Sequence, residues 1–410
     1  MKKATLTISL IGMVLGLCAA WTACGEERVA ITKVRPETAP AIAVERIVEK
    51  KPLVQIAVLL DTSGSMSGLI DQARAELWAI VNEFIFAKRG GVEPEVQVAL
   101  YEYGKSALSV TDGYIRQIVP FTTDLDKVSE ELFALQTNGG DEYCGWVIKE
   151  ATAKLKWSDS PDDLKVIFIA GNEPFTQGPV DYKESCKAAI AKNIVVNTIH
   201  CGSEGDGLNG KWKDGAVLAD GRYLNIDQNR QIVHVAAPQD KAITELSIKL
   251  NDTYIAYGSY GSVASQRQEA QDSSAAGLSK EAAVQRSVAK ASANYRNDGW
   301  DLVDALAIQK VKLEDVKNED LPENMRKMSV EERKAYVEGK QKERADIQAK
   351  VQRLNEQRKI YVAAEMSKQQ KEGQTLGSAV IQAVREQAQK RNFKFEPPKE
   401  LPVEGKNTPK

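Results

Sequence analysis

Two kinds of apolar pattern alternate along the chain between residues 53 and 258. Nearly continuous apolar runs, which are typical of strands buried on both faces of a sheet, occupy 54–60, 165–170 and 194–200. Weaker or alternating strand patterns occupy 96–103, 114–121 and 221–227. Apolar residues at helical spacing occur in 68–86, 125–135, 144–155, 182–192 and 239–250. This alternation predicts an α/β fold, with a doubly wound and mostly parallel sheet covered by helices on both faces.

After residue 258 the pattern becomes helical and rich in Ala, Gln, Glu, Lys and Arg. We expect a helical region over 262–396 and a disordered tail over 397–410. One long helical pattern covers 329–371, and a second helix is predicted from 376 onward. Together they predict a helical hairpin that packs on itself or on the first domain. A coiled coil between chains is disfavoured because charged residues interrupt the thin apolar seam.

Residues 1–24 have the pattern of an export signal. Lys2 and Lys3 precede an apolar stretch that is too short for a comfortable membrane span. The small residues before Cys24 resemble a bacterial lipoprotein cleavage site, at which Cys24 would be lipidated and would anchor the protein to a membrane. Ordinary signal cleavage, which would leave a soluble secreted protein, is the alternative. Residues 25–52 lack sustained periodicity and are predicted to form a linker.

Composition narrows the range of functions. The 55 basic and 57 acidic residues give a net charge of −2, which argues against a nucleic-acid binder. Only two histidines occur, which nearly excludes a zinc site built from His. The Gly-rich stretch 202–207 lacks the Lys-Ser/Thr pair of a phosphate loop, and we expect a surface loop there. Three cysteines follow the signal region, so one disulfide and one free thiol is the simplest expectation, with the pair left open: Cys144, Cys186 and Cys201.

The motif with the clearest chemistry is DTSGS at 61–65, between the first predicted strand and the first predicted helix. In an open parallel sheet, ligands bind at the carboxyl ends of the strands. The carboxylate of Asp61 and the hydroxyls of Ser63 and Ser65 can face one cation there, and all-oxygen ligands suit Mg²⁺ better than zinc. The motif resembles the metal-ion-dependent adhesion site of von Willebrand factor type A domains. The resemblance covers residues 53–258, and we expect a domain of that type there.

This resemblance implies that two further loops complete the metal site. In the family the second loop usually carries a Thr and the third an Asp. Here Asp141 stands where the Thr would be, and Gly171 stands where the Asp would be. One carboxylate is gained and one is lost, and Asn172 or Glu173 could add an outer oxygen. We therefore expect Mg²⁺, or alternatively Mn²⁺ or Ca²⁺, to be bound by Asp61, Ser63, Ser65, Asp141 and Asn172.

The resemblance also implies a function in recognition rather than catalysis. In the family, the metal accepts a Glu or Asp side chain of a partner as its last ligand. We expect a non-enzymatic protein of the cell envelope that binds a protein or peptide through an acidic side chain. Direct contact between Asp141 and the metal would weaken this attraction or leave the metal structural. The same topology places all three body cysteines near the site, and Cys186–Cys201 is the first choice for a disulfide.

Two other functions compete with this expectation. In the first, a structural or assembly protein has a degenerate metal site and binds its partner through the C-terminal helices, which deletion of 262–410 would test. The second and more remote is a serine hydrolase, because residues 64–68 also match G-x-S-x-G. Ser67 would then be the nucleophile, with His200 or His234 as its base. The fit is poor, since Ser67 lies seven residues beyond the strand end at Leu60, whereas a nucleophile elbow follows its strand directly.

Overall fold

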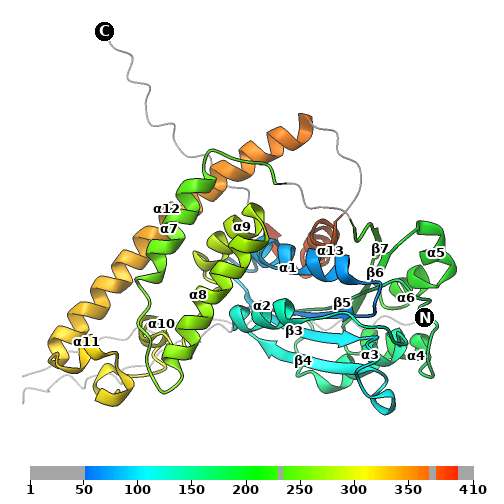
Figure 1. Ribbon diagram of the computed structural model, residues 1–410, viewed down its shortest axis with the longest axis horizontal. Coiled ribbons are helices and arrows are strands. Elements are labelled where there is room, and N and C mark those ends of the chain that lie inside the picture. Colours follow the sequence, from blue (N-terminus) through cyan, green and yellow to red (C-terminus); the bar gives the residue numbers. More distant parts are fainter. Residues whose placement is uncertain (1–50, 230–233, 369–374, 396–410) are drawn as a thin grey trace, which may run out of the picture. The chain divides into compact units, whose positions relative to one another are not determined.

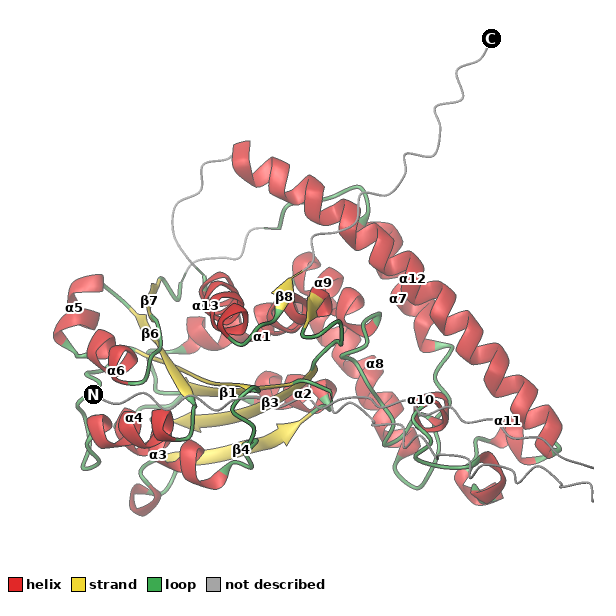
Figure 2. Cartoon of the chain, turned by 180° about the vertical axis from the view of Figure 1, so that it is seen from behind, coloured by secondary structure: helices red, strands yellow, loops and turns green. Residues whose placement is uncertain are grey.

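The computed structural model describes residues 51–229, 234–368 and 375–395. The predicted signal with Cys24, nearly all of the predicted linker and the predicted tail lie outside these residues. Six strands form the central sheet in the order β4-β3-β1-β5-β6-β7 (Figures 1 and 2). Their bounds are β1 Leu53–Asp61, β3 Glu95–Tyr103, β4 Ile115–Thr122, β5 Leu164–Gly171, β6 Val195–Cys201 and β7 Tyr223–Ile226. The edge strand β4 runs antiparallel to β3 and the other pairs are parallel, which confirms the predicted fold class.

The parallel strands bring their carboxyl ends to one edge of the sheet. Asp61 is the last residue of β1 and pairs with Tyr103, the last residue of β3. On the other side, Gly171 ends β5 and pairs with His200 near the end of β6. The loops that follow β1, β3, β5 and β6 therefore meet at this edge, where ligands of open parallel sheets bind.

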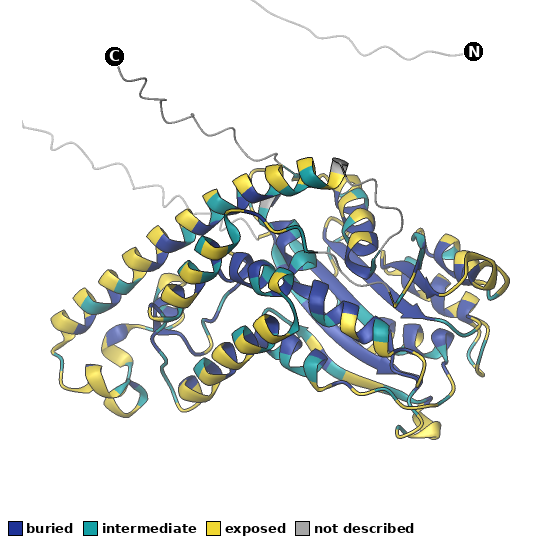
Figure 3. Cartoon of the chain, turned by 45° about the horizontal axis from the view of Figure 1, so that its top comes forward, coloured by how far each residue is buried: buried dark blue, intermediate teal, exposed yellow. Residues whose placement is uncertain are grey.

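The central strands of the sheet are buried (Figure 3). Helices cover both faces of the sheet, and each face has its own apolar core. On one face lie α3 (Cys144–Lys154), α4 (Tyr182–Ala191) and α6 (Trp212–Leu218). On the other lie α1 (Ser67–Asn82), α2 (Leu125–Ala134) and α13 (Leu376–Lys390). A short α5 (Glu204–Asn209) occupies the Gly-rich stretch that we expected to be a loop, and its first turn is capped by the Ser203 hydroxyl. Shorter elements are η1 Glu83–Phe86, β2 Ala87–Lys88, η2 Val110–Asp112 and β8 Lys394–Phe395.

The remaining helices form a region beside the sheet. They are α7 Asp240–Asn251, α8 Gly261–Leu278, α9 Lys280–Lys290, α10 Leu302–Ala307, η3 Leu313–Asp315, η4 Asn318–Asp320, α11 Glu323–Arg326 and α12 Val330–Lys368. The long helix α12 packs on α7 and α9 through Ile347 and Val351. The charges that interrupt its seam are buried in ion pairs: Arg344 bonds Asp301 and Asp304, and Arg358 bonds Asp240 and Glu281. Within the described residues, no helix is both long enough and apolar enough to cross a membrane.

The two helices predicted as a hairpin do not pack mainly on each other. The contacts of α13 are with α1, β5 and β7, whereas those of α12 are with α7, α9 and α10. By its internal contacts, the chain from Lys50 to Lys410 forms one compact unit, in which the sheet and the C-terminal helices are packed together. Because α13 supplies part of the core over the sheet, deletion of 262–410 would uncover that core and cannot test the C-terminal helices alone.

Side chains of α1 hold the beginning of α13. The Thr375 hydroxyl donates to Glu76 Oε1 at 2.7 Å, and the Gly377 amide donates to the other oxygen of Glu76. The Leu376 amide donates to Gln72 Oε1 at 2.9 Å. The first amides of a helix lack partners within it, so these acceptors anchor α13 to α1.

Candidate functional site

The DTSGS loop gathers its three predicted ligands at the end of β1. Asp61 is completely buried, and its Oδ1 accepts the Ser63 amide at 2.7 Å. The hydroxyls of Ser63 and Ser65 lie 3.3 Å apart. Ser65 is exposed and donates to Oδ1 of Asn172, from the loop after β5, at 3.5 Å. The structure therefore brings Asp61, Ser63, Ser65 and Asn172 together, and the site opens to solvent at Ser65.

The second loop brings a different carboxylate to the site from the one predicted. Asp141 is exposed, and its Oδ2 accepts the Tyr143 hydroxyl at 3.2 Å. Glu142 is only 5% exposed, and the Ser63 side chain lies close enough to oppose the rise in the pKa of its carboxyl group. A Cβ at Gly104 would lie 2.7 Å from Glu142 Cγ and 2.9 Å from Asp61 Oδ1. The side chains of Glu142 and Asp61 therefore lie close together, in the space left by the missing side chain of Gly104. Asp141, which we predicted as a metal ligand, is thus on the outside, and Glu142 lies beside Asp61 instead.

Local hydrogen bonds explain why Glu142 and not its neighbour turns inward. The Glu142 amide donates to Gln177 Oε1 at 2.8 Å, which ties this part of the loop to the segment after β5. The Asn138 amide donates to the Thr62 carbonyl at 2.9 Å, which ties the start of the loop to the DTSGS segment. With the backbone held at both points, Glu142 is buried at the site and Asp141 is left exposed to solvent.

The third loop has no room for the carboxylate that the family usually has there. A Cβ at Gly171 would lie 2.6 Å from the Tyr103 hydroxyl and 3.0 Å from Asp61 Oδ2. The Tyr103 hydroxyl donates to the Ala170 carbonyl at 3.0 Å, so its position is fixed. The volume that an Asp would need is thus filled by Tyr103. Glu173, two residues further on, acts electrostatically on Asp61 and Glu142 instead.

The site concentrates negative charge in a buried place. Burial and, to a smaller extent, the charge of Glu173 raise the pKa of Asp61 to about 7, although hydrogen bonds from Ser63 oppose the shift. Burial raises the pKa of Glu142 to about 8, with Asp61 and Glu173 adding to the effect. Oδ2 of Asp61 is buried without any hydrogen-bond partner. A buried carboxylate oxygen without a partner is costly, and a bound cation would remove this cost.

These residues fit a hard cation held by a mixed set of oxygens. Asp61 and Glu142 offer carboxylates, and Ser63 and Ser65 offer hydroxyls, a ligand set typical of Mg²⁺, Mn²⁺ or Ca²⁺. Within the described residues, no group of three or more His, Cys, Asp and Glu side chains is arranged to hold a metal. A cation here would therefore depend on the hydroxyls as well as on the carboxylates.

A cavity of about 530 Å³ adjoins the site at the ends of β5 and β6. Its lining includes Asn172, Glu173, His200 and Asp206. Nε2 of His200 lies 3.2 Å from the Asn172 carbonyl, and burial lowers the pKa of His200. A partner that contacts the cation could place an adjoining group in this cavity.

The family model of the von Willebrand factor type A domain matches residues 55–210. This segment is a von Willebrand factor type A domain. The matched range contains the DTSGS loop and the second and third loops of the site. Domains of this type commonly mediate interactions between proteins. None of the curated proteins matches the chain.

Solved structures with similar folds cover less than half of this chain. They include the conserved hypothetical protein BatB from Bacteroides thetaiotaomicron, at 17% identity and a TM-score of 0.32, covering 42% of this chain and 90% of that protein. The SpRpn10 von Willebrand A domain is 16% identical with a TM-score of 0.32, covering 44% of this chain and all of that domain. Proximal thread matrix protein 1 from the mussel byssus is 11% identical with a TM-score of 0.32; 42% of this chain matches 41% of that protein.

The predicted disulfide of the von Willebrand A domain is not formed. Cys144, Cys186 and Cys201 are buried free thiols. Cys186 lies in the core beneath α3 and α4, whereas Cys201 lies in the core on the opposite face of the sheet. The sheet therefore separates the two thiols, and the Cys186–Cys201 pairing is wrong. Burial raises the pKa of all three thiols, which makes them unreactive.

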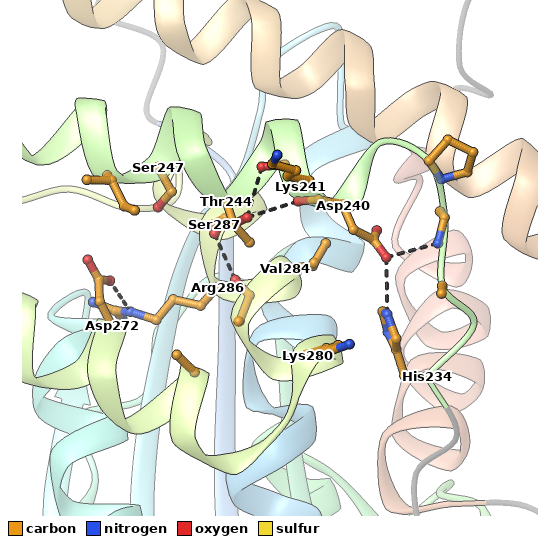
Figure 4. A pocket seen from close by; sticks show the side chains of 16 residues that line it. His234, Asp240, Lys241, Thr244, Ser247, Asp272, Lys280, Val284, Arg286 and Ser287 are labelled. Atoms are coloured by element: carbon orange, nitrogen blue, oxygen red, sulfur yellow. Dashed lines mark hydrogen bonds and ion pairs between the residues drawn. The ribbon is translucent and has the colours of Figure 1, made fainter.

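The hydrolase alternative finds no support in the von Willebrand A domain. Ser67 is the exposed first residue of α1, and within the described residues no hydrogen bond joins it to either histidine. His200 faces the Asn172 carbonyl and the Asn225 side chain, which lies 3.4 Å from its Nδ1. His234 lies in a different cavity, of about 600 Å³, between α7, α8 and α9 (Figure 4). There it contacts Asp240 at 3.1 Å and Glu281 at 2.8 Å.

Sequence reasoning missed one residue at the site and one cavity elsewhere in the molecule. It named Glu173 only as a possible outer ligand and did not consider Glu142, although Glu142 stands beside Asp141 in the same acidic pair. It also missed the cavity between α7 and α9, whose lining comes from helices outside the matched range. No motif in the sequence marks that cavity.

Proposed function

We propose that this protein is a non-enzymatic binding protein of the cell envelope, whose von Willebrand A domain recognises a protein or peptide with the help of a divalent cation. The observation that carries this proposal is the convergence of Asp61, Ser63 and Ser65 at the carboxyl edge of the sheet, with Oδ2 of Asp61 buried and unpartnered. A bound cation would stabilise a buried carboxylate oxygen that has no hydrogen-bond donor.

Each residue of the loop has a distinct task in this proposal. Asp61 supplies a buried negative charge to the site, and its hydrogen bond from the Ser63 amide fixes the DTSGS loop next to this carboxylate. Ser63 stands between Asp61 and Glu142, and Ser65 lies at the solvent side beside Asn172. When bound, a divalent cation would supply a positive centre for an oxygen of the partner. The cavity beside Asn172 and Glu173 offers room for the part of the partner that adjoins this oxygen.

The location at the envelope rests on the sequence. Residues 1–24 have the pattern of an export signal, and Cys24 follows small residues as in lipoprotein signals. A lipid at Cys24 would hold the protein at a membrane, and the linker over 25–52 would separate the folded unit from it. Mass spectrometry of the protein purified from membranes tests this, because a lipid-modified Cys24 at the N-terminus has a characteristic mass.

Calorimetric titration with Mg²⁺, Mn²⁺ and Ca²⁺ tests the cation site. The sample is the chain without residues 1–24, compared with Asp61→Asn and with Asp71→Asn as the matched control. Asp71 lies on the exposed side of α1, where its carboxylate pairs with Arg74 at 2.9 Å. We expect one of the three cations to bind the parent chain and the Asp71→Asn variant equally, and Asp61→Asn at least about ten-fold more weakly.

The proposal fails if no cation binds the parent chain, or if Asp61→Asn binds as well as the parent. Where cation binding is established, peptide arrays probed with and without a chelator identify the recognised side chain. Binding of peptides that is unaffected by the chelator would exclude recognition through the cation.

The alternative, in which the C-terminal helices bind the partner, is less well supported. The charged residues Arg344 and Arg358 on the seam of α12 are engaged in internal ion pairs. The helix α13 is committed to the core of the sheet. These helices therefore already have partners within the chain.

A further inference from the structure

We propose that Glu142 is a ligand of the cation, opposite Asp61, and that the remaining open side of the cation takes a neutral oxygen, such as a hydroxyl or amide of the partner, rather than a carboxylate. This inference rests on the proposed function, since it concerns the ligands of the same site. It assigns the second carboxylate to Glu142 and changes the class of partner that the site accepts.

The first argument is geometric. Glu142 and Asp61 approach each other over Gly104, whose φ of +81° and lack of a Cβ leave the space for both side chains. The Ser63 amide donates to Asp61, and the Ser63 side chain also acts on the carboxyl group of Glu142, so the three residues lie close together. Asp61 Oδ1 is the oxygen on the Gly104 side, whereas Oδ2 of the same carboxylate lies on the Gly171 side and has no hydrogen-bond partner. A cation bound at the Asp61 carboxylate, with Glu142 as a second ligand, would give Oδ2 the partner that the protein does not supply.

The second argument concerns the backbone that presents Glu142. Its amide is held by Gln177, and the preceding residues are held by the Thr62 carbonyl and by Ser106, whose hydroxyl donates to Asn138 Oδ1 at 2.6 Å. The loop is thus fixed to the DTSGS segment, to the segment after β3 and to the segment after β5. Asp141 cannot exchange places with Glu142 without breaking these bonds. Its carboxylate instead bonds the Tyr143 hydroxyl on the outside.

The third argument is electrostatic and concerns the charge of the group that the partner offers to the cation. With Asp61, Glu142 and Glu173 ionised around it, a divalent cation is already outweighed by three negative charges. A further carboxylate would approach a centre of net negative charge, which the low dielectric of a buried site makes unfavourable. A neutral oxygen donor carries no such penalty. Asp206 in the adjoining cavity adds to the negative field that an acidic partner would meet.

Matched carboxyl-to-amide variants test the ligand assignment. Mn²⁺ affinity is measured by calorimetry for the chain without residues 1–24 and for Glu142→Gln and Asp141→Asn. We expect Glu142→Gln to weaken Mn²⁺ binding at least about ten-fold and Asp141→Asn to change it less than about two-fold. Loss of affinity in Asp141→Asn, with Glu142→Gln unchanged, would overturn the assignment. Circular dichroism shows whether Glu142→Gln folds. If it does not, Glu142→Asp replaces it, because this variant keeps the charge and shortens the side chain. We expect Glu142→Asp to bind Mn²⁺ more weakly than the parent chain, and an unchanged affinity would overturn the assignment.

Sodium acetate serves as the probe for the class of partner, compared with sodium chloride at equal ionic strength. We expect acetate to leave the Mn²⁺ affinity of the parent chain unchanged and to increase that of Glu142→Thr, in which the second carboxylate is absent. An equal increase in both proteins would overturn the preference for a neutral ligand. Failure of the proposed function is distinguishable, because then the parent chain binds no cation or Asp61→Asn binds normally. If Asp61→Asn loses binding and Glu142→Gln does not, only the present inference fails.

Discussion

At the scale of single residues, the structure contains buried charges that oppose folding as well as charges that stabilise it. Asp61 is completely buried with one oxygen unpartnered, and Glu142 and Glu173 add repulsion. Without a cation, such a group lowers the free energy of unfolding. Lys290 is also completely buried, and its contacts with Asp272 at 2.7 Å and with the side chain of Asn251 only partly offset the cost of burying its charge. The ion pair between Arg286 and Asp126, at 2.7 Å, is by contrast a buried charge pair in which each charge has its partner.

In the presence of a chelator, Asp61→Asn is expected to be more stable than the parent chain. The amide keeps an oxygen to accept the Ser63 amide but removes the buried charge. At pH 8 we expect a gain of about 1–3 kcal/mol in the free energy of unfolding, measured by urea denaturation. Asp71→Asn, at an exposed position, should change it by less than about 0.5 kcal/mol. A less stable Asp61→Asn would show that the carboxylate is satisfied without a cation.

Lys290 gives the stability an alkaline dependence. Burial lowers the pKa of Lys290 to about 8, although Asp272 opposes the shift. Between this value and the pKa of an unfolded lysine, the unfolded chain binds more protons, so the contribution of Lys290 to stability rises with pH. We expect the stability of the parent chain relative to Lys290→Met to increase by about 1–2 kcal/mol between pH 7.5 and 9.5. The same comparison with exposed Lys241→Met should be flat; a flat result for Lys290→Met as well would contradict the prediction.

The sequence predicted the local part of the site and not the part that depends on loop conformation. Asp61, Ser63 and Ser65 lie within five residues that join a strand to a helix, so their spacing already determines that they face one point. Asp141 and Glu142 are adjacent in an irregular loop, and which of them turns inward is decided by Gln177, 35 positions from Glu142. The cysteine error was avoidable in principle: Cys201 and Ile199 share one face of β6, and α4 with Cys186 covers the other.

At the scale of elements, the joint between α1 and α13 is held by side chains of one helix at the end of another. Glu76 bonds the Thr375 hydroxyl and the Gly377 amide, and Gln72 bonds the Leu376 amide. Since α1 begins directly after the DTSGS loop, the cation site and the last helix share one element. The capping box at Thr375 adds a local bond to Ser378.

Glu76→Ala is expected to lower the free energy of unfolding by about 1–2 kcal/mol and to make α13 accessible to protease. The substitution removes acceptors from two donors at the beginning of α13. Limited trypsin digestion followed by mass spectrometry should show faster cleavage at Arg385 and Lys390. Glu245→Ala, at a carboxylate that is 59% exposed, is the control and should leave both measurements unchanged. Cleavage at equal rates in both variants would show that Glu76 does not anchor the helix.

Hydrophobic periodicity predicted the elements whose apolar faces are long and missed the short ones. The runs at 54–60, 165–170 and 194–200 correspond to β1, β5 and β6, because buried parallel strands are apolar throughout. The helix α5 was predicted as a loop because three glycines outweighed its capping residue, Ser203, whose hydroxyl accepts the Asp206 amide. The packing of α13 on the sheet could not be predicted, because an apolar helix face does not specify which surface it covers.

At the scale of the whole molecule, the sheet and the C-terminal helices share their cores and their ion pairs. Arg286 of α9 bonds Asp126 of α2 at 2.7 Å, and Tyr295 donates to the other oxygen of Asp126. The core over one face of the sheet includes Leu376 and Val384 of α13. The unit from residue 50 to 410 is therefore expected to unfold as a whole.

Deletion of residues 375–410 is expected to abolish cooperative unfolding. Each large apolar side chain that α13 buries contributes about 1.5–3 kcal/mol, so their joint loss is comparable with the 5–15 kcal/mol that a domain typically has. Increased fluorescence of an apolar dye and a broad thermal transition would show the uncovered sheet. Deletion of 397–410 alone is the control and should leave the transition unchanged. A sharp transition after the larger deletion would mean that the sheet is stable without its last helix.

The position of α13 also has a consequence for when the molecule can fold. Leu376 and Val380 line the same apolar space as Ile56 and Val58, more than 300 positions earlier in the chain. During synthesis the sheet strands emerge long before the helix that covers them, so one of their faces stays open to water until α13 has been made. A chain without α13 cannot complete the core over that face of the sheet. Contacts between residues more than 300 positions apart in the sequence also slow the last step of folding. For a protein with a predicted export signal, this delay would keep the chain unfolded enough to pass through a translocation channel until α13 has been released.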